Sequence, residues 1–139
     1  MSDIKFTDNS IKVINAIDRE ILNALEEASG EMESQVKRNT KVKSSKTKNS
    51  WNHTVDEKNH VAYVGSNYEN AIWEEFGTGI YAQNGNGRKD VPWVYKDEDG
   101  KWHSTKGKKP RKALQKAFRS LKPRIKAYFE ERFKDLWYK

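Results

Sequence analysis

Apolar side chains recur at intervals of three and four residues along the first quarter of the chain. They begin at Ile11 and continue past Gly30 without a change of phase. This spacing places them on one face of an amphipathic helix, and Asn9 or Ser10 can cap its start. We therefore predict a long helix from about Ser10 to about Arg38. Within it, Gly30 costs about 1 kcal/mol relative to alanine but does not end the helix.

Two short segments in the middle of the chain alternate between apolar or aromatic side chains and polar ones. The alternating positions are Trp51, His53 and Val55 in the first segment and Val61, Tyr63 and Gly65 in the second. A period of two is typical of strands, so we predict a β-hairpin with a turn of four or five residues. A second hairpin is predicted over residues 93–104, where Asp99-Gly100 is a strong turn signal. The polar, glycine-rich residues 82–90 predict an exposed loop.

A second helical pattern closes the chain. Pro110 fits the first turn of a helix, and apolar residues from Leu114 to Trp137 keep one helical face. Pro123 interrupts this pattern, because a proline inside a helix removes a hydrogen bond and costs about 3 kcal/mol. We therefore expect either a kink near residues 119–122 or two helices in series.

Together these elements predict a single α+β domain over residues 1–139. A long N-terminal helix and a kinked C-terminal helix pack on a small antiparallel sheet of hairpins. A basic segment, 37–50, follows the first helix, and a loop and hairpin, 80–108, precede the last. The hydrophobic content of 35% is low for a chain of 139 residues that must bury its core alone. We therefore expect partners to contribute to its stability.

Positive charge is concentrated in two regions. Residues 37–50 hold six basic side chains, no acidic ones and Val42 as their one apolar residue, so we interpret this segment as a linker or interaction arm. Residues 101–129 hold eleven Lys or Arg and no acid, and the whole chain carries a net charge of +7. Such charge attracts nucleic acid, acidic protein surfaces or anionic membranes. The candidate contacts to a partner or to DNA are Lys37, Arg38, Lys41, Lys43, Lys46, Lys48, Lys108, Lys109, Arg111 and Lys112.

Composition narrows the chemistry that the chain can perform. There is no cysteine, so disulfides and thiolate metal sites are excluded and a reducing cytosol is suitable. The three histidines lack the spacing of a metal pair on a helix, and no catalytic group of residues is recognisable. The chain has no apolar run of 18 residues and its start lacks the pattern of a signal peptide. We predict a protein without enzymatic activity, cofactor, metal or membrane association.

Residues 68–79, with the sequence YENAIWEEFGTG, form the most distinctive segment. Tyr68, Ile72 and Phe76 stand four apart, which places them on one stripe of a short helix. Gly77 and Gly79 then allow the positive φ angles of a sharp exit from that helix. We expect Phe76 to be buried where the two long helices meet the sheet, so that Phe76→Ala would cost roughly 3 to 5 kcal/mol.

The ending Glu-Phe-Gly-Thr-Gly resembles a signature of the gene-product-ten-like tail-component family of long-tailed bacteriophages. Residues 93–95 with Gly100 resemble the hairpin of that family, and residues 113–118 resemble the start of its last helix. Residues 48–51 depart from the family pattern, which has a glycine before a leucine ahead of the first strand. The residues that match the signature are Tyr68, Glu75, Phe76, Gly77, Thr78 and Gly79. From its position we expect Glu75 to pair with an Arg or Lys on a neighbouring element.

The resemblance implies a structural virion protein of the neck or tail, assembled in the host cytoplasm. It implies a homo-oligomeric ring at the head–tail interface that contacts a head connector or adaptor protein on one side. On the other side it implies contact with a tail terminator or tail tube protein, with genome DNA passing through the lumen. The basic segments with nearby aromatic residues leave a second hypothesis open, a basic nucleic-acid-binding module that contacts phosphates and stacks on bases.

Overall fold

The computed structural model describes residues 10–40 and 45–138. Their secondary structure is mixed, with four α-helices, one 3-10 turn and two pairs of antiparallel strands, which confirms the α+β class. In chain order the elements are α1 (Ser10–Asn39), α2 (Ser45–Ser50), β1 (Asn52–Asp56), β2 (Val61–Gly65), α3 (Glu69–Phe76), η2 (Gly79–Tyr81), β3 (Trp93–Lys96), β4 (Trp102–Thr105) and α4 (Ala113–Tyr138).

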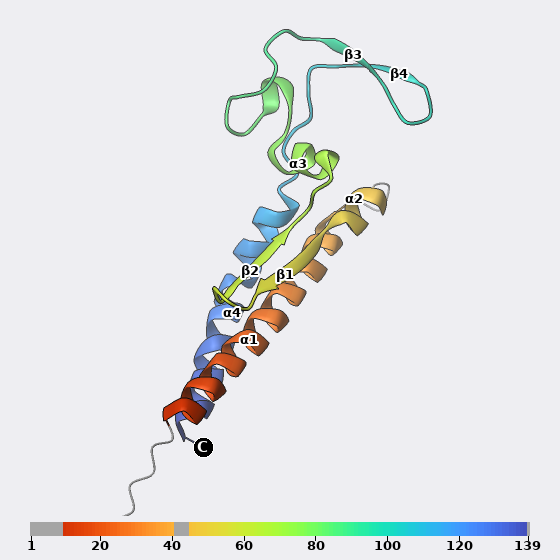
Figure 1. Ribbon diagram of the computed structural model, residues 1–139. Coiled ribbons are helices and arrows are strands. Elements are labelled where there is room, and N and C mark those ends of the chain that lie inside the picture. Colours follow the sequence, from red (N-terminus) through yellow and green to blue (C-terminus); the bar gives the residue numbers. More distant parts are fainter. Residues whose placement is uncertain (1–9, 41–44, 139) are drawn as a thin grey trace, which may run out of the picture.

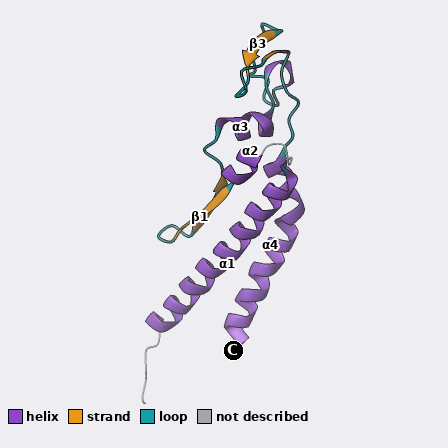
Figure 2. Cartoon of the chain, turned by 90° about the vertical axis from the view of Figure 1, so that its right-hand side faces the viewer, coloured by secondary structure: helices purple, strands orange, loops and turns teal. Residues whose placement is uncertain are grey.

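The molecule is elongated, with the two long helices as its shaft (Figures 1 and 2). α1 and α4 lie side by side and antiparallel, so that the start of α1 is next to the C-terminal end of the chain (Figure 1). The β1–β2 hairpin runs along the helix pair, and α2 and α3 lie at its far end. The β3–β4 hairpin projects beyond α3 and forms a second sheet of its own. The predicted sheet of hairpins is therefore two separate two-stranded sheets, of which only β1–β2 packs on the helices.

Ion pairs between the long helices join an acidic face of α1 to the basic α4. The guanidinium of Arg132 donates to the carboxylates of Glu20 and Glu27, each at 2.7 Å. Arg124 lies 3.4 Å from Glu31. The hydrogen bond to Glu20, with that to Glu27, raises the pKa of Arg132 further above its usual value. Part of the positive charge of α4 is thus neutralised inside the molecule.

α4 begins later than predicted and continues through its proline. Its first residue is Ala113 rather than Pro110, and Pro123 lies within one helix, so the alternative of two helices in series is wrong. Both flanks of the proline pack on the rest of the fold, with Leu121 buried and Ile125 packed against the core. This packing offsets the lost hydrogen bond.

None of the described helices combines the length and the apolar composition that a membrane-spanning segment requires.

The β1–β2 hairpin forms at the predicted place, but β2 presents its other face to the helices. The inward pairs are His53 with Val64 and Val55 with Ala62. Val61 and Tyr63, the apolar positions of the second alternating segment, are exposed. The four-residue turn pairs Asp56 with Val61. Because side chains alternate along a strand, a pairing that differs by one residue reverses the face.

The basic segment 37–50 is not a linker throughout. Its first three residues belong to α1 and its last six form α2. Among its described residues, hydroxyl groups hold it to the fold: Thr40 and Thr47 are buried. Thr47 Oγ1 accepts a hydrogen bond from Asn70 at 2.9 Å, and Thr40 Oγ1 accepts one from the Trp51 indole at 3.1 Å. Composition alone missed these contacts, since threonines contribute nothing to a count of apolar residues.

The core is small and rich in alanine. It lies where the second half of α1, α3 and the first half of α4 meet. Its buried members are Met32, Val36, Trp51, Ala71, Ala113, Ala117 and Leu121. Among the described residues, thirteen large hydrophobic side chains are exposed, more than the eight hydrophobic side chains that are buried. The fold therefore leaves large apolar side chains open to contacts with other molecules.

Candidate assembly interface

The signature segment, residues 68–79, crosses the strand-like stretch that leads into α4. The amide of Thr78 donates to the carbonyl of Lys108 at 2.9 Å, and the amide of Lys108 donates back to the Thr78 hydroxyl at 2.9 Å. The amide of Ile80 donates to the carbonyl of Lys106 at 3.2 Å. These bonds fix the path of the chain on both sides of the 80–105 excursion. The signature therefore joins the projecting β3–β4 hairpin to the helical shaft.

Glycines make this crossing possible. Gly77 and Gly79 have φ angles of +78° and +61°, as predicted. A Cβ atom added to Gly79 would lie 2.0 Å from the carbonyl oxygen of Lys106, and one added to Gly107 would lie 2.1 Å from that of Thr78. The two backbones thus approach too closely for any side chain. The sequence alone does not identify Gly107, because nothing local to it shows which distant segment it faces.

Glu75 is buried and caps α4 from outside that helix. One carboxylate oxygen accepts from the amide of Leu114 at 2.9 Å, and the other accepts from the amide of Gln115 at 2.8 Å. Lys112, the residue before α4, has a φ of +56° and a side chain that cannot accept these bonds. The predicted pairing of Glu75 with an Arg or Lys is therefore wrong. The free amides and positive dipole at a helix start satisfy the carboxylate instead.

The apolar stripe of α3 faces solvent. Ile72 is 47% exposed, Trp73 50% and Phe76 42%, whereas Ala71 and Glu75 are buried. The prediction that Phe76 is buried is wrong, because α3 turns its smallest side chain to the core and so packs closely against it. Tyr68, which starts the segment, does pack against that core. We call Ile72, Trp73 and Phe76 the signature patch.

The signature patch forms one wall of a groove of about 500 Å³ that reaches to the base of the β3–β4 hairpin. Trp93 also lines the groove, and the Arg88 guanidinium lies over its ring at 5.3 Å from the centroid. Asn84 and Asn86 from the exposed loop add polar groups at the edge. A mixed surface of aromatic rings and one arginine is typical of protein interfaces.

The β3–β4 hairpin has two faces of different character. On one face Tyr95 stacks on His103, with ring centroids 5.2 Å apart. On the other face Val94 is 62% exposed and Trp102 68% exposed, and Lys96 lies over the Trp102 ring at 5.9 Å. Within the described chain no third strand or helix covers this second face. A tryptophan this exposed makes this face a candidate contact surface.

The hairpin turn is acidic and well ordered by its own side chains. The Asp97 carboxylate accepts from the amides of Asp99 at 3.0 Å and Lys101 at 2.8 Å. It also lies 2.6 Å from Nε2 of His103, and this hydrogen bond lowers the pKa of Asp97. Glu98 lies 3.4 Å from the Lys46 ammonium on α2. The turn therefore keeps a fixed shape at the end of a projecting hairpin.

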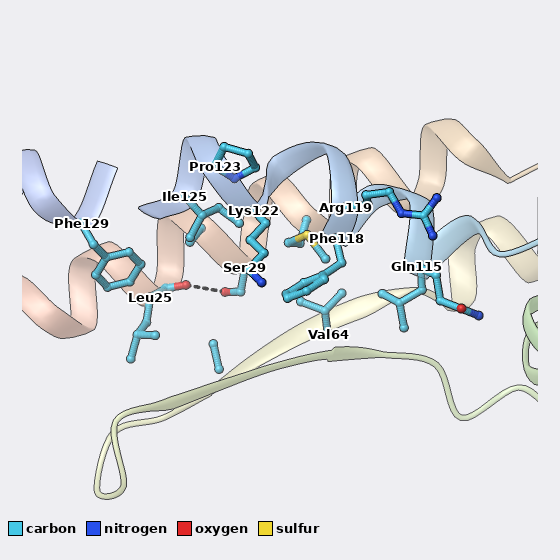
Figure 3. Close-up of a pocket in the computed structure, with 14 residues that line it drawn as sticks. Leu25, Ser29, Val64, Gln115, Phe118, Arg119, Lys122, Pro123, Ile125 and Phe129 are labelled. Atoms are coloured by element: carbon cyan, nitrogen blue, oxygen red, sulfur yellow. Dashed lines mark hydrogen bonds between the residues drawn. The ribbon is translucent and has the colours of Figure 1, made fainter. Parts of the chain in front are cut away.

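A larger groove lies on the side of the shaft, between α1, α4 and β2 (Figure 3). We call it the side groove. Its volume is about 820 Å³, and apolar side chains form most of its lining. The lining residues are Leu25, Ala28, Ser29, Met32, Ala62, Val64, Leu114, Gln115, Phe118, Arg119, Lys122, Pro123, Ile125 and Phe129. The Phe118 ring lies between α4 and Val64 of β2 (Figure 3) and is 54% exposed.

The structure brings the candidate basic contacts toward one end of the shaft, where α1 ends and α2 and α4 begin (Figure 1). A hydrogen bond of 3.0 Å from the Asn39 side chain to the carbonyl of Ala113 joins the two long helices there. The described candidates are Lys37 and Arg38 on α1, Lys46 and Lys48 on α2, and Lys108, Lys109, Arg111 and Lys112 before α4. Lys41 and Lys43 lie outside the described residues.

Several of these cations already have partners. Lys37 lies 3.9 Å from the Glu33 carboxylate, and Lys109 lies over the Tyr81 ring at 5.8 Å. Lys46 combines its contact with Glu98 with a position over the Tyr68 ring at 5.2 Å. The signature and the basic segment are therefore linked through one lysine.

His53 and His60, unlike His103, pair with carboxylates of α1. His53 Nε2 lies 2.7 Å from Glu26, and its Nδ1 lies 3.5 Å from Glu33 without forming a hydrogen bond. The bond with Glu26 raises the pKa of His53. His60 Nε2 forms a short contact with Asp18. Within the described residues, no three His, Cys, Asp or Glu side chains are grouped so that they could hold a metal ion.

The described chain therefore offers four candidate contact surfaces. They are the signature patch, the uncovered face of the β3–β4 hairpin, the side groove and the basic end of the shaft. Comparison of the chain with family models, with curated proteins and with solved structures finds no match.

Proposed function

We propose that this chain is a structural virion protein of a long-tailed bacteriophage. It forms a ring at the head–tail interface, joins the head connector or adaptor to the tail terminator or tail tube, and surrounds the DNA channel. Its work is assembly rather than catalysis. It acts in the neck or tail of the virion after assembly in the host cytoplasm.

One observation carries this proposal: more large apolar side chains are exposed than buried among the described residues. They include the signature patch beside the projecting hairpin and the outer face of that hairpin itself. A chain that leaves such surfaces uncovered is stabilised by partners. The signature that resembles the phage tail-component family supports the choice of partners.

Removal of the gene from the phage tests the proposal. We expect full heads and separate tails to accumulate, and the purified protein, when added back, to join them. Imaging of joined particles should locate the chain in a ring at the neck or tail end. Infectious particles of normal yield that lack the chain would refute the proposal.

A basic nucleic-acid-binding module is the alternative. Of the eleven cations between residues 101 and 129, Arg124 alone lies within ion-pair distance of a carboxylate among the described residues. Tight binding of DNA by the free monomer, with an affinity that falls steeply as salt rises, would favour this alternative. Replacing Lys108, Lys109, Arg111 and Lys112 by Gln should then reduce the slope of log affinity against log salt.

A further inference from the structure

The side groove is open and apolar at its centre. Phe118 stands in it with 54% of its surface exposed, between α4 and Val64 of β2 (Figure 3). Ile125 and Phe129, about two and three α4 turns further along, continue the apolar floor. A groove of about 820 Å³ accommodates several side chains. Contact between water and this apolar lining is unfavourable in free energy, and an apolar occupant would remove that contact.

The rim of the side groove is basic. Arg119 and Lys122 project from α4 beside Phe118, and the Lys122 ammonium lies 5.8 Å from the centroid of that ring. Neither cation lies within ion-pair distance of a carboxylate in the described part of the chain. An occupant that joins apolar side chains to a nearby acidic group would therefore match both the floor and the rim.

The β3–β4 hairpin has these two properties. Val94 and Trp102 lie on one face, because Val94 pairs with Ser104 and Lys96 pairs with Trp102 across the ladder. The acidic turn that follows this face holds carboxylates at residues 97–99, of which Asp97 bonds to His103 and Glu98 to Lys46 within the same molecule, so Asp99 is the one considered for a contact. Lys96 and Lys101 flank the turn, and Lys96 is directed to the Trp102 ring.

The hairpin of the same molecule does not fill the groove. It projects beyond α3 at the far end of the shaft, whereas the groove lies between α4 and β2 along the side (Figure 1). The signature crossing holds the base of the hairpin, through the Thr78 and Lys108 hydrogen bonds, so the hairpin cannot fold back along the shaft without breaking them. A hairpin in the groove must therefore come from another molecule.

We propose that the β3–β4 hairpin of one copy docks in the side groove of a second copy of this chain. Val94 and Trp102 pack against Phe118 and its apolar neighbours, and the carboxylate of Asp99 faces Arg119 and Lys122. The contact joins two different surfaces, so each copy offers a hairpin to one neighbour and a groove to the other. Such a contact closes into a ring when its rotation permits. This inference rests on the proposed function for ring closure and names the surfaces that close the ring.

Disulfide trapping tests the contact, since the parent chain has no cysteine. Two single variants are mixed under mild oxidation: Ser104→Cys on the docking face of the hairpin and Arg119→Cys on the rim of the groove. We expect a disulfide-linked dimer that contains one of each. The matched control pairs Ser104→Cys with Lys58→Cys in the β1–β2 turn and should give little product. Equal trapping in both mixtures would overturn the proposal.

Substitutions test its energetics by sedimentation or native mass spectrometry of the full chain. Trp102→Ala should weaken self-association at least about tenfold. Tyr63→Ala removes a similarly exposed aromatic, 59% against 68%, outside both surfaces and should leave association unchanged. Arg119→Glu should weaken association, and the double variant with Asp99→Lys should recover part of it. A ring that forms normally from Trp102→Ala chains overturns this docking while leaving the proposed function in place.

Two further outcomes show whether a different protein, or no second copy, fills the side groove. If Phe118→Ser leaves self-association intact but abolishes binding to a purified head or tail protein, the groove receives that protein and the proposal is wrong. If the chain stays monomeric at every concentration and within particles, no copy docks on another, and both this docking and the ring in the proposed function are wrong. The head–tail joining test with the gene removed is independent of both results, so it separates failure of the docking from failure of the proposed function.

Discussion

At the scale of single residues, Glu75 and the glycines of the signature act through contacts with the backbone. Glu75 satisfies two amides of α4, and Gly79 leaves space for the carbonyl of Lys106. Each of these residues supports a segment distant in the sequence. Glu75 and the glycines of the signature thus hold distant segments of the fold together, and their substitutions should be read as changes in stability.

Gly79→Ala should destabilise the fold by more than about 2 kcal/mol, because the added Cβ meets a carbonyl oxygen at 2.0 Å. Gly85→Ala is the matched control: Gly85 has a similar φ of +68° but no atom within 4 Å of an added Cβ. It should lose only the penalty of positive φ, about 1–2 kcal/mol. Denaturant titration of both variants measures the difference, and equal losses would show that the close approach is unimportant.

Glu75→Gln should cost about 1–3 kcal/mol, since the amide can accept one of the two bonds but sets its NH2 group against the second donor. Glu57→Gln, in the exposed β1–β2 turn, should change stability by less than about 0.5 kcal/mol. Thermal unfolding of the two variants compares them. A Glu75→Gln protein as stable as the parent would mean that water satisfies the start of α4 equally well.

His53 should make stability depend on pH. Its bond with Glu26 raises the folded pKa above the unfolded value of about 6.5. The stabilisation is therefore fully present below that value and is lost as pH rises through the raised folded pKa. Glu33, itself paired with Lys37, also faces this ring. Because this pair is partly exposed, its contribution to the free energy of unfolding should be about 0.5–1 kcal/mol.

Unfolding free energies of the parent and Glu26→Gln, measured from pH 5 to pH 9, check this prediction. The difference between the two proteins should be largest at the acid end and should shrink as pH rises. A difference that grows toward alkaline pH would contradict the assigned protonation.

At the scale of elements, the two long helices supply the frame and tolerate local weaknesses within it. α1 contains Gly30 and α4 contains Pro123, and neither helix ends there. Ion pairs of Arg132 with Glu20 and Glu27 join the helices before Gly30 and after Pro123, and core packing of Val36 and Ala117 joins them on the other side of these points. The frame is therefore stabilised by tertiary contacts more than by helix propensity.

Gly30→Ala should stabilise the protein by about 0.5–1 kcal/mol, through reduced entropy of the unfolded chain and higher helix propensity. An added Cβ would meet only the His53 Cε1 atom, at an ordinary distance of 3.9 Å. Chemical denaturation measures the gain. A loss of stability would indicate that His53 cannot accept the methyl group.

At the scale of the whole molecule, folding and assembly use different apolar surfaces. The alanine-rich core holds the chain together, whereas the signature patch and the hairpin face remain open. Substitutions in the patch should therefore affect partners more than the fold. Comparing the effects of such substitutions on stability and on assembly therefore tests the structural role proposed for the chain.

Phe76→Ala should cost at most about 1.5 kcal/mol of stability, because the ring is 42% exposed, rather than the 3 to 5 kcal/mol of a buried ring. Its incorporation into particles should nevertheless fall. Thermal unfolding and quantification of the chain in purified particles measure the two effects, with Tyr63→Ala as the control. Severe unfolding would show that the patch belongs to the core after all.

The sequence alone determined the elements that depend on local periodicity and backbone freedom. The helix over residues 10–39, both hairpins and the positive φ of Gly77 and Gly79 follow from spacing and residue type, and the structure confirms them. These features require only near neighbours in the chain, which is why they could be predicted.

Tertiary structure decided which face of each element is buried. Periodicity grouped Ile72 with Phe76 correctly but could not show that the opposite side of α3, with Ala71, faces the core. In the same way, the pairing register fixed the inward face of β2, and the amides of α4 determined the role of Glu75. A pattern along one segment specifies relative positions on that segment. The choice between its faces depends on the shape and the unsatisfied hydrogen bonds of segments far away in the chain, and these meet only in the folded molecule.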